Sequence, residues 1–399
     1  MVCPHPAARL RWEVLRRVGH PSRIFDRGDV GQNGGVTVSR LWVERYRSLV
    51  DLHIDLYPVT VIQGENATGK TNLYRVLLLL SRGAGGALAR TLLDEGGMPS
   101  ALWAGEPPSR GRKPAVVRMR FGAAVDEISY ELSLGLPSVD ASTTPFSLDA
   151  EVKEELAWFG PARTRYTELL DRAGSTATAR DVDGATSTFA TMLDRFEPAL
   201  AQLGEPARFP ELYDLRERMR HWRFYQQIPT GPDAPARSPR PGVRTPVLAD
   251  DGRDLAAALA TIDDMGSGPA LRDAVEDAFP GAELVIVVDR GVFAVGLAMP
   301  GLRRPMGAHE LSDGTLRYLS LVAALLTPRP PELLVLNEPE TSLHGSLIEP
   351  LARLVVEAAR YSQLVVTTHS STLASALADG TGYAPIVLRR HSGATTIDA

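Results

Sequence analysis

Residues 64–71 read Gly-Glu-Asn-Ala-Thr-Gly-Lys-Thr, a complete G-x-x-x-x-G-K-T pattern. A β-branched apolar run at residues 59–62 precedes the pattern, and a run of helical composition at residues 72–80 follows it. This order constrains the fold more than any other feature, because it predicts a strand, a loop whose backbone N–H groups face phosphates, and a helix that begins there. The sequence therefore predicts a site for a nucleoside triphosphate.

The residues of this loop have separate expected roles. Gly64 and Gly69 let the backbone turn around the phosphates. The Lys70 ammonium can reach the β- and γ-phosphate oxygens, and the Thr71 hydroxyl can ligate Mg²⁺. The residues expected to surround the nucleotide are Gly64, Glu65, Asn66, Ala67, Thr68, Gly69, Lys70, Thr71 and Asn72.

Three further motifs follow the loop in the chain. Residues 310–315 read Glu-Leu-Ser-Asp-Gly-Thr before a helical run at residues 316–326. Residues 333–340 are an apolar run that ends in Asn-Glu-Pro-Glu, and residues 364–370 are an apolar run that ends at a histidine. Taken singly, each has an ordinary interpretation as a capped helix or a buried strand with a polar end. Their order after the loop favours an ATPase.

The chain resembles the stand-alone AAA-family ATPases of the RecF, SMC and OLD branch. The resemblance is carried by residues 43–49 (Val-Glu-Arg-Tyr-Arg-Ser-Leu), the loop at 64–71, and residues 310–315, 337–344 and 367–370. Residues 95–105 and 222–225 are similar to a bacterial subgroup described only as "predicted ATPase". The resemblance extends from about residue 37 to the end of the sequence. It implies an α/β P-loop NTPase fold, an ABC-type ATPase head with a mixed central sheet.

The resemblance also implies roles for individual residues. Ser312 and Gly314 correspond to an ABC signature that contacts the γ-phosphate bound by a second copy, in an ATP-sandwich homodimer. Glu338 is placed as the catalytic glutamate, which orients or deprotonates the attacking water, and His369 as the switch histidine that senses the γ-phosphate. Together with Lys70, Glu338 and His369 are the expected catalytic residues, and ATP and Mg²⁺ the expected cofactors.

Three assignments depart from the family pattern or leave alternatives. Asn337 stands where a Walker B aspartate is usual, so it is expected to hold a Mg²⁺-bound water with one negative charge fewer. Gln226 or Gln227 could supply the Q-loop glutamine near the metal, or both could be solvent-facing. Arg47 matches a nucleotide contact of related heads, with a solvated surface arginine as the alternative.

The spacing of the motifs predicts the domain organisation. The interval between Lys70 and Ser312 is long and lacks a sustained heptad repeat, which favours a compact helical lobe inserted in the head. We expect a disordered extension at residues 1–35, or a true start near Val36. The expected segments are 36–150 for the first half of the ATPase domain, 151–221 for the inserted helical lobe, and 222–399 for the second half. The short stretch after His369 predicts a head without an attached effector domain.

Several elements are expected from the local pattern. Hairpins are predicted for residues 116–134, 284–298 and 386–397. Helices are predicted for residues 189–203, 211–221 and 254–263.

The composition restricts the class of protein and the cellular compartment that are compatible with this sequence. The 399 residues, 44% of them hydrophobic, can bury a large core. The single cysteine, Cys3, excludes an internal disulfide and a cysteine zinc site and favours the reducing cytoplasm. No apolar run reaches the roughly 18 residues that span a bilayer. The net charge of −5 gives no general attraction to nucleic acid.

Two functional hypotheses remain. The first is an ATP-hydrolysing homodimer linked to DNA repair, maintenance or phage defence. The second is a nucleotide-gated switch with slow or no hydrolysis that controls a separate protein effector. A transporter ATPase is a distant third, because its interval between loop and signature is far shorter. The candidate DNA surface comprises Arg110, Arg112, Lys113, Arg118, Arg120, Arg237, Arg240 and Arg244.

Overall fold

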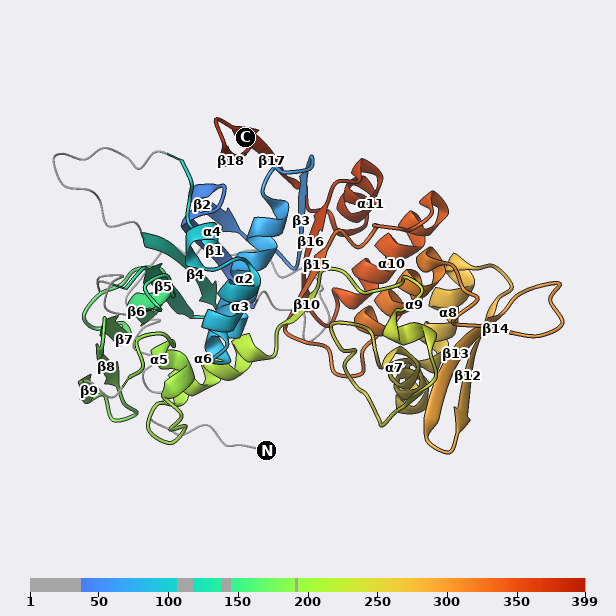
Figure 1. The fold of residues 1–399 in the computed structure, drawn as a ribbon, viewed down its shortest axis with the longest axis horizontal. Helices are drawn as coiled ribbons and strands as arrows, with labels where there is room; N and C mark the ends of the chain where they lie inside the picture. Colours follow the sequence, from blue (N-terminus) through green and yellow to red (C-terminus); the bar gives the residue numbers. More distant parts are fainter. Residues whose placement is uncertain (1–36, 106–117, 138–144, 191–192, 399) are drawn as a thin grey trace. The chain divides into compact units, whose positions relative to one another are not determined.

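A computed structural model describes residues 37–105, 118–137, 145–190 and 193–398 (Figure 1). The expected extension at residues 1–35 lies outside the described residues. The strands are β1 (Val38–Tyr46), β2 (Leu49–Asp55), β3 (Val59–Gly64), β4 (Arg118–Val125), β5 (Ile128–Gly135), β6 (Glu151–Phe159), β7 (Glu168–Ala173), β8 (Thr176–Arg180), β9 (Thr186–Ala190), β10 (Arg223–Tyr225), β11 (Arg240–Pro241), β12 (Glu283–Asp289), β13 (Val292–Ala298), β14 (Met306–Gly307), β15 (Leu333–Asn337), β16 (Gln363–Thr368), β17 (Ile386–His391) and β18 (Ala394–Ile397). The helices are α2 (Lys70–Ala84), α3 (Leu88–Asp94), α4 (Met98–Ala101), α5 (Ala199–Gln202), α6 (Pro210–Arg220), α7 (Leu255–Ile262), α8 (Gly268–Ala278), α9 (Asp313–Leu325), α10 (Ile348–Ala358) and α11 (Ser371–Thr381), with short turns η1 (Pro235–Arg237), η2 (Asp263–Ser267) and η3 (Gly345–Leu347).

A six-stranded sheet carries the motifs found in the sequence. Its order is β10-β15-β16-β3-β17-β18, and all neighbouring pairs are parallel except β17 and β18. The buried side chains of β15 alternate between two hydrophobic clusters. Leu333 and Val335 pack with α2, whereas Leu334 and Leu336 pack with α9, α10 and α11. A parallel sheet covered on both faces needs such a continuous apolar run. The carboxyl ends of its strands therefore meet at one edge.

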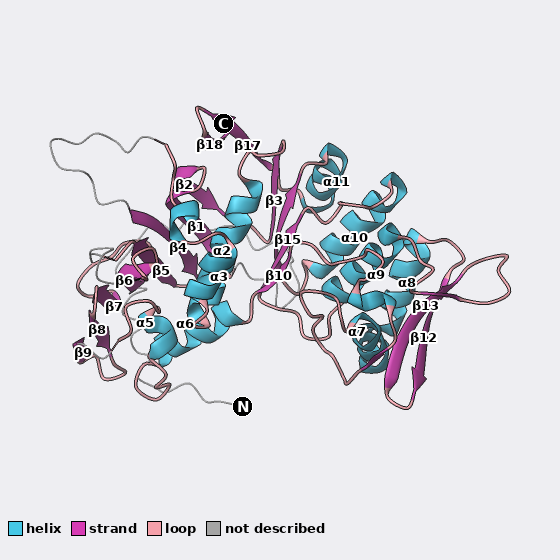
Figure 2. Ribbon diagram, viewed as in Figure 1, coloured by secondary structure: helices cyan, strands magenta, loops and turns pink. Residues whose placement is uncertain are grey.

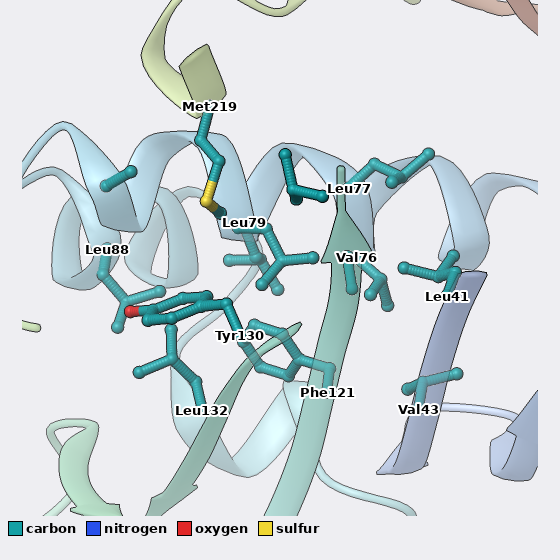
Figure 3. Close-up of a cluster of buried hydrophobic side chains, with 14 of the residues drawn as sticks. Leu41, Val43, Val76, Leu77, Leu79, Leu88, Phe121, Tyr130, Leu132 and Met219 are labelled. Carbon is teal, nitrogen blue, oxygen red and sulfur yellow. The ribbon is translucent and has the colours of Figure 1, made fainter. Parts of the chain in front are cut away.

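The second large sheet packs on α2. It is antiparallel and has the order β2-β1-β4-β5-β6-β7-β8-β9. Successive buried residues of α2 recur at helical spacing at positions 73, 76, 77 and 80, so one side of the helix is apolar. Figure 3 shows Val76, Leu77 and Leu79 of α2 against Phe121 and Leu132 of this sheet. This packing holds the helix that begins at the P-loop.

The helices of the second half cover the opposite face of the six-stranded sheet (Figure 2). α10 buries Ile348, Leu351 and Val355 at helical spacing, and α7 packs on α9. A small sheet of β11, β13 and β12, with β14 paired to β13, adjoins α7 and α8. The motif-bearing residues 310–315 belong to this half of the protein.

The expectation of a helical lobe at residues 151–221 was wrong in its secondary structure. Its first part forms β6 to β9, which extend the antiparallel sheet, and only α5 and α6 are helical. Alanine, leucine, glutamate and arginine suggested helix, but β8 and β9 also carry Thr176, Thr178, Thr186 and Thr188. β-branched residues favour a pleated, half-buried surface, and pairing with β5 decides the outcome.

Turn residues in the same segment were the missed signal. Gly174 has a φ of 59° between β7 and β8, and Gly184 has a φ of 83° after Asp183, between β8 and β9. An Asp-Gly pair between two β-branched runs is typical of a hairpin. The expected helix at 189–203 is reduced to α5 at its end, while residues 191–192 lie outside the described residues.

The other local expectations are confirmed. The three predicted hairpins correspond to β4–β5, β12–β13 and β17–β18, although residues 116–117 of the first lie outside the described residues. The predicted helices at 211–221 and 254–263 correspond to α6 and α7. The α/β head with a mixed arrangement of strands is thus confirmed.

Candidate nucleotide-binding site

The P-loop joins β3 to α2 at the carboxyl edge of the six-stranded sheet. A Cβ on Gly64 would lie 2.5 Å from Thr68 Oγ1, so the tight turn excludes a side chain there. Gly69 has a φ of 106°, a left-handed conformation that favours glycine, and a Cβ there would overlap Thr395 Oγ1. Both glycines are therefore required by the backbone. The tip formed by Glu65, Asn66 and Ala67 is exposed.

Side chains from two other segments brace the P-loop. Thr395 in β18 donates from Oγ1 to the Thr68 carbonyl at 2.8 Å and shares a hydrogen bond with the Ser48 hydroxyl at 2.7 Å. Asn72 donates from Nδ2 to Ser48 Oγ at 2.9 Å. Neither Ser48 nor Thr395 was predicted to belong to the site. These contacts fix the first turn of α2, where Thr71 lies half-buried and without a hydrogen bond from its hydroxyl to another described side chain.

Lys70 is the central cation of the site. Its side chain is only 3% exposed. The ammonium donates to the Gly64 carbonyl at 2.7 Å and to the Glu65 carbonyl at 2.9 Å, and lies 3.4 Å from Glu338 Oε1. A buried ammonium needs such partners, because an unpaired charge is costly to remove from water. The P-loop lysine therefore lies beside Glu338 of the acidic motif within one chain, a contact that the sequence did not predict.

Glu338 follows β15 directly and has an unusual backbone. Its φ is 49°, a left-handed conformation that non-glycine residues seldom adopt and that is often found at functional sites. Its amide donates to the Thr367 carbonyl at 2.9 Å, which ties the turn to β16. The side chain stays 28% exposed. The carboxylate is therefore held at the sheet edge beside Lys70 while it still faces solvent.

Asn337 is buried at the end of β15. It pairs in register with Thr367, whose hydroxyl donates to Asn337 Oδ1 at 2.7 Å. This hydrogen bond uses one of the two lone pairs of Oδ1 and leaves the other for a water. Among the described residues, no group of three or more His, Cys, Asp or Glu has metal-binding geometry. Mg²⁺ at this site would therefore depend on phosphate oxygens, with the Thr71 hydroxyl and waters as further ligands.

His369 lies at the end of β16, close to two carboxylates. Its Nδ1 is 3.2 Å from Glu340 Oε1 and 3.9 Å from Glu338 Oε1. Glu340 is buried and also accepts hydrogen bonds from Thr368 Oγ1 at 2.5 Å and from the amide of His369 at 3.1 Å. Sequence reasoning missed Glu340, although the second acid of Glu-Pro-Glu was a visible signal. Glu340 therefore positions His369 through contacts with both its backbone amide and its ring nitrogen Nδ1.

We expect Glu340→Gln to lower the kcat of ATP hydrolysis about tenfold with little change in KM. Glutamine keeps an acceptor but loses the charge that holds His369, and one charge-assisted hydrogen bond contributes about 1.5 kcal/mol, which is roughly tenfold in rate. Glu349→Gln, at an exposed position in the first turn of α10, is the matched control. A kcat equal in both variants would exclude a role of Glu340 in positioning the histidine.

Arg47 and Gln226 occupy different surroundings. Arg47 has a φ of 49° and donates from Nη2 to the carboxylate and the carbonyl of Glu95, each at 3.1 Å. Gln226 follows β10, which pairs with β15 so that Tyr225 faces Leu336. Gln226 therefore lies at the same edge as the motif residues and is exposed. A contact of either side chain with nucleotide stays a prediction.

The predicted signature residues, Ser312 and Gly314, lie at the start of α9. Ser312 caps α9 and accepts from the Thr315 amide at 3.1 Å. A Cβ on Gly314 would lie 2.7 Å from the carbonyl of Ser342, so the motif packs closely on the loop after β15. No hydrogen bond or ion pair within the described part of the chain joins Ser312 or Gly314 to the P-loop. Within the described chain, the predicted signature residues therefore form no polar contact with the P-loop.

The described part of the predicted DNA surface is largely neutralised. Arg118 pairs with Glu154 at 2.7 Å, and Arg120 lies within 4 Å of Glu154 and two other carboxylates. Arg244 pairs with Asp264 at 2.5 Å. These pairs join residues distant in the chain, so the sequence did not reveal them. The members outside the described residues are Arg110, Arg112 and Lys113.

The fold and the motifs define a P-loop ATPase head of the AAA and ABC type. The chain belongs to the family described as "AAA domain, putative AbiEii toxin, Type IV TA system", which matches residues 59–375. No curated protein matches the sequence. Among the described residues, no helix is long and apolar enough to cross a membrane.

The chain is similar to solved structures of Smc head domains. The chain is similar to an Smc head bound to the C-terminal winged-helix domain of ScpA, with a TM-score of 0.51, 12% identity, and coverage of 90% of this chain and 97% of that chain. A Pyrococcus furiosus Smc head with an extended coiled coil, bound to the C-terminal domain of ScpA, matches with a TM-score of 0.48, 12% identity, and coverage of 90% and 95%. The SMC head from Thermotoga maritima matches with a TM-score of 0.39, 14% identity, and coverage of 90% and 98%.

Proposed function

We propose that this protein is a cytosolic ATPase that hydrolyses ATP with Mg²⁺ as an ATP-sandwich homodimer. The observation that carries the proposal is the convergence of Lys70, Glu338 and His369 at one sheet edge. The three side chains come from the P-loop and from two adjacent parallel strands. This edge of an open α/β sheet is where such folds bind ligands.

The P-loop supplies the binding energy for the triphosphate. Backbone N–H groups at the start of α2 and the Lys70 ammonium attract the phosphate oxygens. In the bound state, phosphate oxygens take over the hydrogen bonds that the ammonium makes with the Gly64 and Glu65 carbonyls. Mg²⁺, when bound, would supply positive charge that stabilises the negative charge of the reacting phosphate group. Thr71, Asn337 and Gln226 are the residues that would hold it, directly or through water.

Glu338 performs the central step of the proposed reaction. Its carboxylate faces solvent beside Lys70, and so it can orient a water or accept its proton. His369 Nδ1 lies 3.9 Å from Glu338 Oε1, and the histidine can bind the γ-phosphate from the end of the next strand. Phosphoryl transfer depends mainly on positioning and electrostatic stabilisation, which these fixed groups provide.

A second copy completes the site in this proposal. Ser312 is exposed at the start of α9 and makes no bond with the P-loop of its own chain. The Ser312 hydroxyl and the Gly314 amide would contact the γ-phosphate held by the partner. Because the arrangement is twofold and isologous, two chains form two equivalent sites and the assembly closes. We place this dimer in DNA repair, maintenance or phage defence.

A second candidate function is a nucleotide-gated switch that controls a separate protein effector. It is favoured by Asn337, which replaces the usual acid and already accepts a hydrogen bond from Thr367. Fewer negative charges near Mg²⁺ weaken its binding and slow turnover. The solved Smc head that resembles this chain is bound to a domain of ScpA, which supports a role for a separate protein partner here.

Steady-state ATP hydrolysis, with and without duplex DNA, separates these candidates, and Lys70→Ala serves as the blank. We expect turnover above the blank, and DNA stimulation that weakens steeply with salt if DNA is a ligand. Turnover equal to the blank in both conditions, with ATP binding intact, would reject the hydrolysis proposal and favour the switch.

A further inference from the structure

Arg237 was grouped with a candidate DNA surface, but the structure places it inside the fold. Its side chain is 9% exposed, and it lies in the short turn η1 in the segment that follows β10. The Nε atom donates to the carbonyls of Thr230 at 2.7 Å and Gly231 at 3.0 Å. The guanidinium thus organises its own loop and is not available as a surface contact for nucleic acid.

The other two nitrogens of Arg237 reach the signature motif. Nη1 donates to the carbonyls of Ala308 at 2.9 Å and Leu311 at 2.8 Å, and Nη2 donates to Asp313 Oδ1 at 2.6 Å. Leu311 and Asp313 are the immediate neighbours of Ser312. Arg237 therefore holds the backbone carbonyl of Leu311, which precedes Ser312, and the side chain of Asp313, which follows it.

This arrangement depends on the shape of arginine. The guanidinium is a rigid planar fork with five N–H donors, whereas lysine has a flexible point charge with three. The donors of Arg237 are used on carbonyls of two segments and on one carboxylate. Ser312 itself is exposed, although its two neighbours are held. The hydrogen bonds of Arg237 therefore fix the residues around the exposed Ser312 hydroxyl, which can contact a ligand bound by another chain.

The preceding turn of the motif is fixed independently. Arg304 donates to both oxygens of Glu310 at 2.7 Å, and the Gly307 amide donates to the same carboxylate at 3.0 Å. The hydrogen bond from Arg304, with that from Gly307, lowers the pKa of Glu310 to about 2. The carboxylate thus stays ionised at neutral pH. Arg237 is therefore the brace specific to the residues around Ser312.

We propose that Arg237 is a positioning residue for the signature motif, which holds Ser312 and Gly314 in the geometry that contacts a nucleotide bound by the second copy. The proposal rests on the proposed ATP-sandwich dimer. Arg237 does not touch the nucleotide. It acts on the site of the partner, so its loss should impair hydrolysis at that site and leave the P-loop of its own chain intact.

Arg237→Ala is expected to lower ATP hydrolysis about 100-fold, the effect of misplacing a catalytic contact by about 1 Å. The affinity of the chain for ATP should be unchanged, because the hydrogen bonds of Arg237 go to residues 230, 231, 308, 311 and 313 and none of them joins the P-loop. Arg237→Lys should fail to restore hydrolysis, and it replaces the alanine variant if that variant does not fold. Arg253→Ala is the matched control, since the exposed Arg253 pairs with Asp251 at 3.3 Å in the segment that precedes α7.

A mixing experiment tests whether Arg237 acts across the dimer. Arg237→Ala and Glu338→Gln chains are mixed before ATP is added, and hydrolysis is measured. In a mixed dimer, one site combines an intact P-loop and Glu338 from the first chain with an intact signature from the second. We expect hydrolysis to return to about a quarter of the wild-type rate, because half of the dimers are mixed and each has one complete site of two.

A parallel mixture of Ser312→Ala with Glu338→Gln separates the possible failures. Recovery in both mixtures supports the proposal. Recovery with Ser312→Ala alone would overturn the role of Arg237 across the interface and leave the sandwich dimer standing. Recovery in neither mixture would overturn the sandwich dimer and, with it, the role of Arg237.

Discussion

Replacement of Glu338 by glutamine is expected to lower ATP hydrolysis about 100- to 10,000-fold, the usual contribution of a general base. Glutamine has nearly the same shape and keeps an acceptor beside Lys70, but it cannot take a proton from water. The carboxylate lies 3.4 Å from Lys70 Nζ and 3.9 Å from His369 Nδ1, so it is within 4 Å of both groups. ATP affinity should be preserved or slightly increased, because a negative charge near the phosphates is removed.

The change in kcat is measured under saturating Mg²⁺-ATP. Glu357→Gln, on α10 and partly exposed beside Arg360, is the control and should hydrolyse ATP at the wild-type rate. The positive φ of Glu338 is unaffected, since glutamine has the same backbone preferences. Turnover of Glu338→Gln equal to that of the wild type would show that another group activates the water.

Lys70→Ala is expected to weaken ATP binding by about 2–5 kcal/mol, the effect of removing one member of a buried charge pair. This corresponds to more than about 30-fold in Kd. The ammonium is buried and anchored to the Gly64 and Glu65 carbonyls, and among the described residues no other lysine or arginine pairs with Glu338. Hydrolysis should fall to the background rate.

Binding of a fluorescent ATP analogue to Lys70→Ala provides the measurement. Lys153→Ala is the matched control, because Lys153 is also buried and pairs with Glu151 at 2.8 Å in the antiparallel sheet. That variant should lower the free energy of unfolding without changing the Kd. Equal losses of affinity in the two variants would mean that general destabilisation, and not the P-loop cation, causes the effect.

Much of the site could be predicted because its motifs are local. Residues 59–72 contain the strand, the glycine turn and the helix start, so the pattern alone places Lys70 at the edge of a sheet. Glu338 and His369 each end an apolar run, and parallel strands bring such ends together. The convergence of these three residues follows from the sequence once the sheet is assumed to be parallel.

Other parts of the site depend on contacts between distant segments. Ser48 and Thr395 brace the P-loop from two chain positions far from it, and neither belongs to a recognisable pattern. Arg237 reaches the signature across more than seventy residues. Its position in a Pro- and Arg-rich segment suggested a surface instead. Hydrogen bonds of this kind are set by tertiary packing, which local propensity does not encode.

The prediction of secondary structure in the inserted segment is limited by the same dependence on distant contacts. Residues 151–221 have a helical composition, and only tertiary pairing with β5 makes β6 a strand. The Asp183-Gly184 turn was a local signal for a hairpin, and it predicts the observed strands better than the helical composition does.

The mass of Glu338→Gln in solution, with and without Mg²⁺-ATP, tests the central claim most directly. Light scattering should show a monomer of the 43.1 kDa chain without nucleotide and a dimer at saturating ATP. Without hydrolysis the nucleotide stays bound, so the two signature motifs should remain engaged across the interface. A monomer that persists at saturating ATP, with binding confirmed, would contradict the ATP-sandwich account.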